Sequence, residues 1–355
     1  MIVASPIREK GRARGACSNR PLTIDQDCVI IDARNRSRSR LSATDYCNHA
    51  ALMTVTEIPV QDSLFPGFRL LDVATSGARI RVRTGGEGPA LLLLHGYPQT
   101  HALWHKLAAR LKDSFTLVCA DLRGYGDSDK PASDAEHFPY SKRAMALDMA
   151  QVMTALGHQR FFVGAHDRGA RVAHRLALDH AERVTKLATL DIAPTREMYA
   201  NTTDAFARAY WHWFFLIQPA PFPERMIGAD PEAYWRKKCG SGSAGLTPFA
   251  PEALAHYLRC FSDPQTIHAS CEDYRAAATI DIRHDDEDGG RKLNQPLLAL
   301  WGGNGIIGTC FEPLALWRQR AENVQGRALP SGHYLAEEIP DLVAAEFTAF
   351  FGEHP

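Results

Sequence analysis

The 355-residue sequence lacks features that would place it in several common functional classes. No apolar run approaches the roughly 18 residues that a membrane-spanning helix needs. Its formal net charge is only −1, which gives no argument for a nucleic acid or an anionic membrane as a partner. We therefore expect neither a nucleic-acid partner nor a membrane partner.

Paired cysteines are also missing. The eight cysteines are scattered, and no two of them form a Cys-x-x-Cys pair. This pattern indicates neither a zinc site nor a disulfide framework, so we expect no metal site. Reduced thiols in a cytoplasmic enzyme are the simplest interpretation.

Residues 1–52 differ from the rest of the chain because they are rich in arginine and serine and have little apolar periodicity. We predict a disordered extension there, with the folded part beginning near Met53. Transit peptides share this composition, but they are poor in acidic residues, and Glu9 and Asp25 argue against one. The lack of a long apolar segment argues against secretion.

Strand and helix patterns alternate along most of the chain from residue 67 onward. The predicted strands cover residues 68–73, 78–83, 89–94, 116–120, 161–165, 186–191, 296–301 and 324–328. The predicted helices cover residues 101–112, 141–157, 168–180, 312–322 and 340–351. The first two strands suggest an antiparallel hairpin, and the later alternation implies a parallel sheet covered on both sides.

The alternation stops between residues 193 and 291, in a segment rich in aromatic residues, prolines and helical patterns. We predict an α/β-hydrolase core with a mostly parallel sheet, made of residues 53–192 and 292–355. Residues 193–291 would form a helical cap inserted into it. Within that segment, the acidic run at residues 284–290 is predicted to be a solvated connection.

The stretch Phe161–Arg171 has the layout of a nucleophile elbow. An apolar strand pattern runs into a tight turn with Asp167 at its tip, and a helix pattern follows. Ala165 and Gly169 provide the small side chains that such a turn needs. Because the tip is a carboxylate, it can attack an sp3 carbon and form an ester that water must then cleave.

A nucleophile of this kind needs a base and an acid. In this layout the base follows the last strand, where His333 stands in a Ser-Gly-His-Tyr sequence. Many such enzymes place the acid shortly after the strand that ends at Trp301, but residues 303–308 contain none. Asp191, which follows the preceding core strand, is the available substitute, and a turn-capping role is its structural alternative.

Two further groups follow from the elbow. The backbone N–H groups of Tyr97 and Arg168 would stabilise an oxyanion on the ester. Arg168 and Arg171 lie three residues apart, on one face of the predicted helix. Two guanidinium groups beside an attacking carboxylate suggest a substrate with its own carboxylate, held bidentately. A structural salt bridge from either arginine is the alternative.

At these motifs the sequence resembles the fluoroacetate dehalogenases, a branch of the haloacetate dehalogenases within the α/β-hydrolases. The resemblance covers about residues 58–355. It rests on the segments His166–Arg171, Leu190–Thr195, Tyr210–Trp213, Gln218–Pro221 and Cys271–Ala276. Tyr97 departs from it, because the family often has phenylalanine there.

The resemblance implies Asp167 as nucleophile, His333 as base with Asp191 as its partner, and the two arginines as carboxylate ligands. It also implies that fluoride is bound by His212, Trp213 and Tyr274, which the sequence alone would assign to packing. Their N–H and O–H groups can stabilise a departing fluoride. The family is commonly homodimeric and uses no cofactor.

We therefore predict hydrolysis of a haloacetate to the hydroxy acid and halide, with a small-molecule haloacid and water as the reactants. One alternative is an epoxide hydrolase with the same Asp–His–Asp triad. Those enzymes usually have tryptophan after the nucleophile and two cap tyrosines, whereas Arg168 and His212–Trp213 stand here. The other alternative is a non-catalytic hydrolase-fold receptor for a small carboxylic acid, which would not require all three triad residues.

Overall fold

The computed structural model describes residues 53–60, 63–242 and 244–352. The predicted N-terminal extension, residues 1–52, lies outside them. Nine strands form one sheet in the order β1-β2-β3-β5-β4-β6-β7-β8-β9. The strands are β1 (Val55–Ile58), β2 (Arg69–Ala74), β3 (Arg79–Gly85), β4 (Ala90–Leu94), β5 (Thr116–Ala120), β6 (Phe161–His166), β7 (Val184–Leu190), β8 (Leu297–Gly302) and β9 (Val324–Leu329). Strands β1 to β3 are antiparallel, as is the β3–β5 pair, and the rest are parallel.

The central strand β4 shows why this part of the sequence forms a covered sheet. All five of its residues are buried. Leu91 and Leu93 belong to one apolar cluster, and Leu92 and Leu94 belong to another. Since successive side chains point to opposite faces of a strand, an unbroken apolar run is what a sheet with helices on both faces requires.

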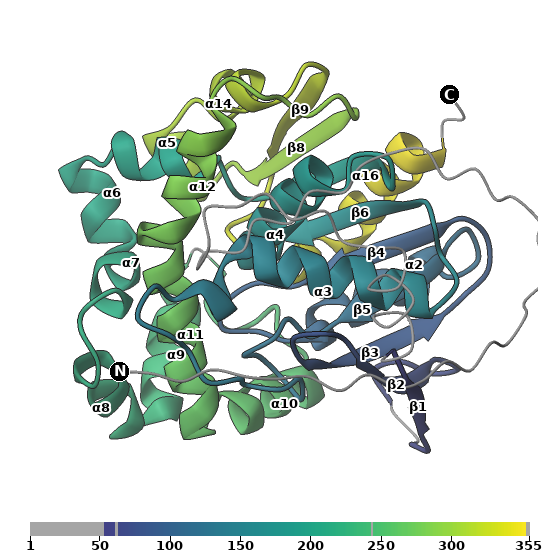
Figure 1. The fold of residues 1–355 in the computed structure, drawn as a ribbon, viewed down its shortest axis with the longest axis horizontal. Coiled ribbons are helices and arrows are strands. Elements are labelled where there is room, and N and C mark those ends of the chain that lie inside the picture. The colour runs from purple at the N-terminus through teal and green to yellow at the C-terminus, as the bar shows by residue number, and fades with distance from the viewer. Residues whose placement is uncertain (1–52, 61–62, 243, 353–355) are drawn as a thin grey trace, which may run out of the picture. The chain divides into compact units, whose positions relative to one another are not determined.

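Helices cover the sheet and follow its strands (Figure 1). These elements are η1 (His101–Trp104), α2 (His105–Leu111), η2 (Phe138–Tyr140), α3 (Lys142–Ala155), α4 (Asp167–Asp179), α13 (Ile307–Cys310), α14 (Pro313–Arg320), α15 (Leu335–Glu338) and α16 (Pro340–Gly352). Helix α4, which begins at the predicted elbow, packs against α3 and against strands β6 and β7. The first turn of α4 is thereby held at the end of the sheet's middle strands.

A run of helices, called the cap helices below, separates β7 from β8 and forms one group beside the sheet in Figure 1. They are α5 (Thr195–Ala200), α6 (Asp204–Ala209), α7 (Trp211–Leu216), α8 (Phe222–Gly228), α9 (Pro231–Gly240), α10 (Pro251–Phe261), α11 (Pro264–Ala278) and α12 (Ile280–Asp288). Helix α11 packs against α7, α8, α10 and α12. We propose that residues 193–291 act as the cap of this fold. None of the helices in the described residues is both long and apolar enough to cross a membrane.

Two predictions about local structure were incomplete or wrong. Strand β1 was not predicted, and it pairs with β2 at the edge of the sheet. The acidic run at residues 284–290 is not a solvated connection, because most of it lies in helix α12. Asp285 and Asp288 there form ion pairs with the buried Arg175 of α4. Sequence alone did not show that this arginine faces the run.

Candidate active site

The structure brings Asp167, Asp191 and His333 together at the carboxyl ends of the parallel strands. Asp167 follows β6, Asp191 follows β7, and His333 lies in the loop between β9 and α15. Nδ1 of His333 is 2.6 Å from Oδ2 of Asp191, a hydrogen bond. Nε2 of His333 is 4.0 Å from Oδ2 of Asp167, which is too long for a hydrogen bond. This edge is where parallel α/β sheets place their sites.

The two carboxylates both lie on sharply turned backbone. Asp167 has φ 45° and Asp191 has φ 54°, in the left-handed region that aspartate tolerates better than most residues. Such a conformation costs about 1–3 kcal/mol and persists where the surrounding packing enforces it. Steric limits around the elbow are tight. A Cβ on Gly169 would lie 2.3 Å from the His95 carbonyl oxygen, and one on Gly96 would lie 2.4 Å from Cβ of Asp167.

The Tyr97 N–H donates to Oδ1 of Asp167 at 2.9 Å. This is the oxygen that an oxyanion site would hold. No hydrogen bond within the described residues joins the Arg168 N–H, the second predicted donor, to Asp167. The Tyr97 phenol, where the resembling family often has phenylalanine, donates to the hydroxyl of Tyr234 at 3.1 Å.

Asp167 remains a carboxylate despite its burial. Burial alone would raise its pKa, but His333, His166, Arg171 and, least, Arg168 act in the opposite direction and hold the pKa below its usual value. The group is therefore ionised at neutral pH and able to act as a nucleophile.

Arg168 does not present its guanidinium in the predicted bidentate way. Its Nε and Nη2 each donate to the Asp273 carboxylate at 2.8 Å. Asp273 also accepts from Lys142, and from the Tyr125 hydroxyl at 2.6 Å. Only Nη1 of Arg168 is left, a buried nitrogen without a partner in the described part of the chain.

Arg171 has different surroundings, because none of the described carboxylates lies within ion-pair distance of it. Its Nη1 donates to the Thr195 hydroxyl at 2.8 Å and to the Ala193 carbonyl at 3.1 Å. Its Nε is buried without a partner among the described residues. Burial and the neighbouring Arg168 lower the pKa of Arg171. A buried cation in this position is costly unless an anion joins it.

The three predicted halide ligands lie on the cap helices, and Tyr274 contacts the rings of both of the others. His212 and Trp213 come from α7 and Tyr274 comes from α11. Nδ1 of His212, Nε1 of Trp213 and the Tyr274 hydroxyl are buried without partners among the described residues. Burial, and then Lys238, hold the pKa of His212 well below its usual value, so this ring is neutral with one N–H.

Ring contacts join these side chains to the arginines. The Arg168 guanidinium carbon is 4.1 Å from the centroid of the Tyr274 ring, and that of Arg171 is 4.7 Å from the Trp213 ring. The rings of His212 and Tyr274 are 5.9 Å apart. Since the rings of Trp213 and Tyr274 are also 6.3 Å apart, the five side chains predicted as ligands form one cluster of contacts.

Asp273 was missed by the sequence prediction, although its neighbour Tyr274 was included. A signal existed, because a buried arginine at position 168 requires a carboxylate partner. Sequence does not say which carboxylate that is, since Asp273 lies 105 positions from Arg168 and approaches it only through packing of α11.

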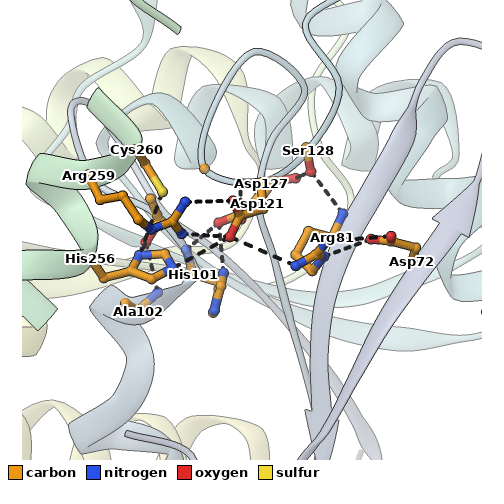
Figure 2. A network of polar contacts seen from close by, with 12 residues as sticks. Asp72, Arg81, His101, Ala102, Asp121, Asp127, Ser128, His256, Arg259 and Cys260 are labelled. Atoms are coloured by element: carbon orange, nitrogen blue, oxygen red, sulfur yellow. Dashed lines mark hydrogen bonds and ion pairs between the residues drawn. The ribbon is translucent and has the colours of Figure 1, made fainter. Parts of the chain in front are cut away.

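One group among the described residues has the composition of a metal site. Ligand atoms of Asp127, His256 and Cys260 lie within 4.8 Å of one another. Figure 2 shows this group at a polar network that joins the loop after β5 to α10. Both oxygens of Asp127 accept from the Arg259 guanidinium, at 3.0 and 2.8 Å. Asp127 and Arg259 thus form an ion pair between the loop that follows β5 and helix α10.

Comparison with known proteins places this fold and these motifs in a family. Residues 89–338 match the family model of the alpha/beta hydrolase fold. The chain belongs to the α/β-hydrolase family. This α/β-hydrolase is 45% identical over 294 residues to a fluoroacetate dehalogenase from a Burkholderia species. The match covers 82% of this chain and 96% of the Burkholderia protein.

Two further relatives of this α/β-hydrolase differ from the first in what their names say. A soluble epoxide hydrolase from Corynebacterium sp. (strain C12) is 32% identical over 286 residues, with 78% of the chain and 94% of that protein covered. A solved structure from Nostoc sp PCC 7120, assigned to the alpha/beta hydrolases, has 55% identity and a TM-score of 0.79. That match covers 81% of this chain and 99% of the Nostoc chain.

Proposed function

We propose that this α/β-hydrolase converts a haloacetate, a fluoroacetate-like 2-haloacid, to the hydroxy acid and halide through an aspartyl ester. The observation that carries the proposal is the buried guanidinium of Arg171, which lacks a carboxylate partner among the described residues and lies beside the carboxylate nucleophile Asp167. The 45% identity to a fluoroacetate dehalogenase supports the same reaction.

In the first half-reaction, Oδ2 of Asp167 attacks the carbon that carries the halogen, while Oδ1 stays on the Tyr97 N–H. The carbon–halogen bond breaks and the halide leaves with its electron pair. Arg171 Nε and Arg168 Nη1 hold the substrate carboxylate, with one nitrogen from each side chain. The halide is therefore bound by three donors on the cap helices.

The cap donors are His212, Trp213 and Tyr274. Their N–H and O–H groups have no partner among the described residues and receive the developing negative charge. Fluoride is a poor leaving group and a strong hydrogen-bond acceptor. Fixed donors aimed at the leaving atom lower the barrier because they need no reorganisation when charge appears.

In the second half-reaction, a water molecule lies in the 4.0 Å gap between His333 and Asp167. His333 Nε2 takes its proton, and the water oxygen bonds to the ester carbonyl carbon. The oxyanion forms on Oδ1, at the Tyr97 N–H. The bond between the ester carbonyl carbon and Oδ2 then breaks, and the departing alkoxide takes the proton from His333. The new carboxyl group of Asp167 releases the second proton of the water to solvent, which restores the carboxylate. Asp191 orients the imidazole throughout.

Epoxide hydrolysis is the second candidate, favoured by the 32% identity to a soluble epoxide hydrolase. The Tyr274 hydroxyl, which has no hydrogen-bond partner in the described part of the chain, would protonate the epoxide oxygen in that reaction. A neutral epoxide leaves Arg171 without an anion, however, and His212–Trp213 occupies the place expected for a second tyrosine. A receptor for a small carboxylic acid would use the arginines but not His333.

The test is incubation of the full chain with fluoroacetate, chloroacetate and an aryl epoxide, with halide, hydroxy acid and diol measured. We expect halide and hydroxy acid from at least one haloacetate and no diol. The variant Asp167→Ala serves as the control and should release neither. Diol without halide would favour the epoxide reaction, and acid binding without any turnover would favour the receptor.

We also propose a homodimer, which the family resemblance implies, and a cytoplasmic location, for which the scattered cysteines are the argument. Phe222 and Met226 on α8 support self-association, because they are 54% and 60% exposed and one helical turn apart. Sedimentation of the full chain tests this directly. A single species with the mass of one chain, at micromolar concentration, would contradict the dimer.

A further inference from the structure

The loop that carries His333 is held by three hydrogen bonds to side chains outside the triad. The Glu338 carboxylate accepts the Gly332 N–H at 2.7 Å and the Tyr334 N–H at 3.0 Å. The His333 carbonyl oxygen accepts from Nε2 of His166 at 2.8 Å. The backbone is therefore fixed on both sides of the imidazole.

The two holding side chains come from different elements. Glu338 is the last residue of α15, and His166 is the last residue of β6, directly before Asp167. The rings of His166 and His333 are 4.6 Å apart. These bonds therefore tie the loop of the base to the strand that carries the nucleophile.

The His333 loop needs such support because residues 330–334 belong to no helix or strand. The hydrogen bond to Asp191 fixes Nδ1 but leaves the ring able to pivot about that contact. The working atom is Nε2, on the far side of the ring. A displacement of about 1 Å at a catalytic group can cost on the order of 10²-fold in rate.

We propose that Glu338 and His166 are positioning residues that aim His333 Nε2 at the water of the second half-reaction. The inference rests on the proposed function, since only an enzyme that forms an ester has a second half-reaction. In the first half-reaction Asp167 attacks carbon and His333 moves no proton. Loss of the positioning bonds should therefore slow ester cleavage and leave halide release intact.

His166 must be neutral and protonated on Nε2 to make its bond, because the acceptor is a carbonyl oxygen. It is fully buried, and burial, followed by the neighbouring His333, lowers its pKa to about 3. This donor is therefore neutral at neutral pH, as the hydrogen bond requires.

The main test is Glu338→Gln in the full chain, with chloroacetate and fluoroacetate under single-turnover conditions. A glutamine offers one acceptor oxygen, so one of the two N–H groups loses its partner. We expect halide release within about twofold of wild type, and ester cleavage slowed by about 10-fold to 10²-fold. Mass spectrometry should detect the ester on the peptide that contains Asp167.

Glu337→Gln is the matched control, because Glu337 lies next to Glu338 on α15 but bonds to Tyr257 and Lys106 instead. It should leave both steps unchanged. His333→Gln is the positive control and should trap the ester. If Glu338→Gln slows both steps equally, or accumulates no ester, the positioning role is wrong. If the wild type releases no halide at all, the proposed function fails instead.

A second pair of variants keeps the test independent of the folding of Glu338→Gln. His166→Leu removes the donor to the His333 carbonyl, whereas His166→Gln can place an amide N–H near the position of Nε2. We expect ester accumulation in the first variant and rescue of ester cleavage by at least about fivefold in the second. Equal ester cleavage in the two variants would overturn the role of His166.

Discussion

At the scale of single residues, the two arginines of the site are not equivalent. Arg168 already has a carboxylate partner in Asp273, while Arg171 has none among the described residues. A buried unpaired charge costs free energy that a bound anion recovers. Most of the preference for an acidic substrate should therefore depend on Arg171.

Replacing Arg171 by methionine tests this difference. We expect the KM for chloroacetate and the Ki for acetate to rise about 10²-fold, since a hydrogen bond to a charged group contributes about 1.5–3 kcal/mol. Steady-state kinetics with acetate as a dead-end inhibitor would measure both constants. An unchanged Ki would show that Arg171 does not bind the carboxylate.

The lowered pKa of Asp167 predicts how the first step depends on pH. In the unfolded chain this carboxyl group has a pKa near 4. In the folded protein its pKa is lower, so the group stays ionised until the pH falls toward that lower value. The rate of halide release in the first turnover should thus be constant between about pH 5 and pH 8. Rapid-quench measurements would reveal a contradiction as a decline with a midpoint above pH 5.

At the scale of elements, the elbow depends on close approach of backbone to backbone. Gly169 has an ordinary helical conformation, so its requirement is steric: a Cβ would lie 2.3 Å from the His95 carbonyl oxygen and 2.6 Å from that of Leu94. The strand β4 and the first turn of α4 can approach this closely only without a side chain.

Gly169→Ala should therefore destabilise the protein by about 1–3 kcal/mol through overpacking and reduce turnover by moving Asp167. Urea unfolding and halide release would measure the two effects. Gly228→Ala is a suitable control because a Cβ there would have no atom of the described residues within 4 Å. Unfolding free energies that match for the two variants would contradict the steric explanation.

Sequence predicted the elements of this fold wherever one physical rule dominated. The apolar run at residues 89–94 gave β4, and the glycine at 157 marked the end of α3. Prediction from sequence failed where contacts between distant segments determined the secondary structure. Strand β1 has three exposed residues and forms by pairing with β2, and the acidic run is helical beside Arg175.

At the scale of the whole folded part, a buried polar network joins the cap helices to the sheet domain. Asp273 of α11 accepts from Arg168 of α4, from Lys142 of α3 and from Tyr125. This network explains why the site was only partly predictable. The reactive residues have local signatures, but their supporting partners meet through packing of distant segments.

The network predicts an order of stability between two variants. Lys142→Met leaves Asp273 paired with Arg168. Asp273→Asn leaves the buried Arg168 without its carboxylate, while Lys142 keeps Asp281 at 3.4 Å. Breaking a buried pair typically costs about 3–5 kcal/mol, so Asp273→Asn should be destabilised by that amount and Lys142→Met by less. Urea unfolding at neutral pH would measure both, and the reverse order would refute this account of the network.

The unequal surroundings of the two Asp167 oxygens have a consequence for isotopes. Oδ1 is held by the Tyr97 N–H, and Oδ2 faces His333. Each catalytic cycle would pass Oδ2 to the product and replace it with an oxygen from solvent, while Oδ1 is retained. Enzyme recovered after many turnovers in oxygen-18 water should therefore carry one heavy oxygen at Asp167. That single label would be a permanent record that only one oxygen of the carboxylate reacts.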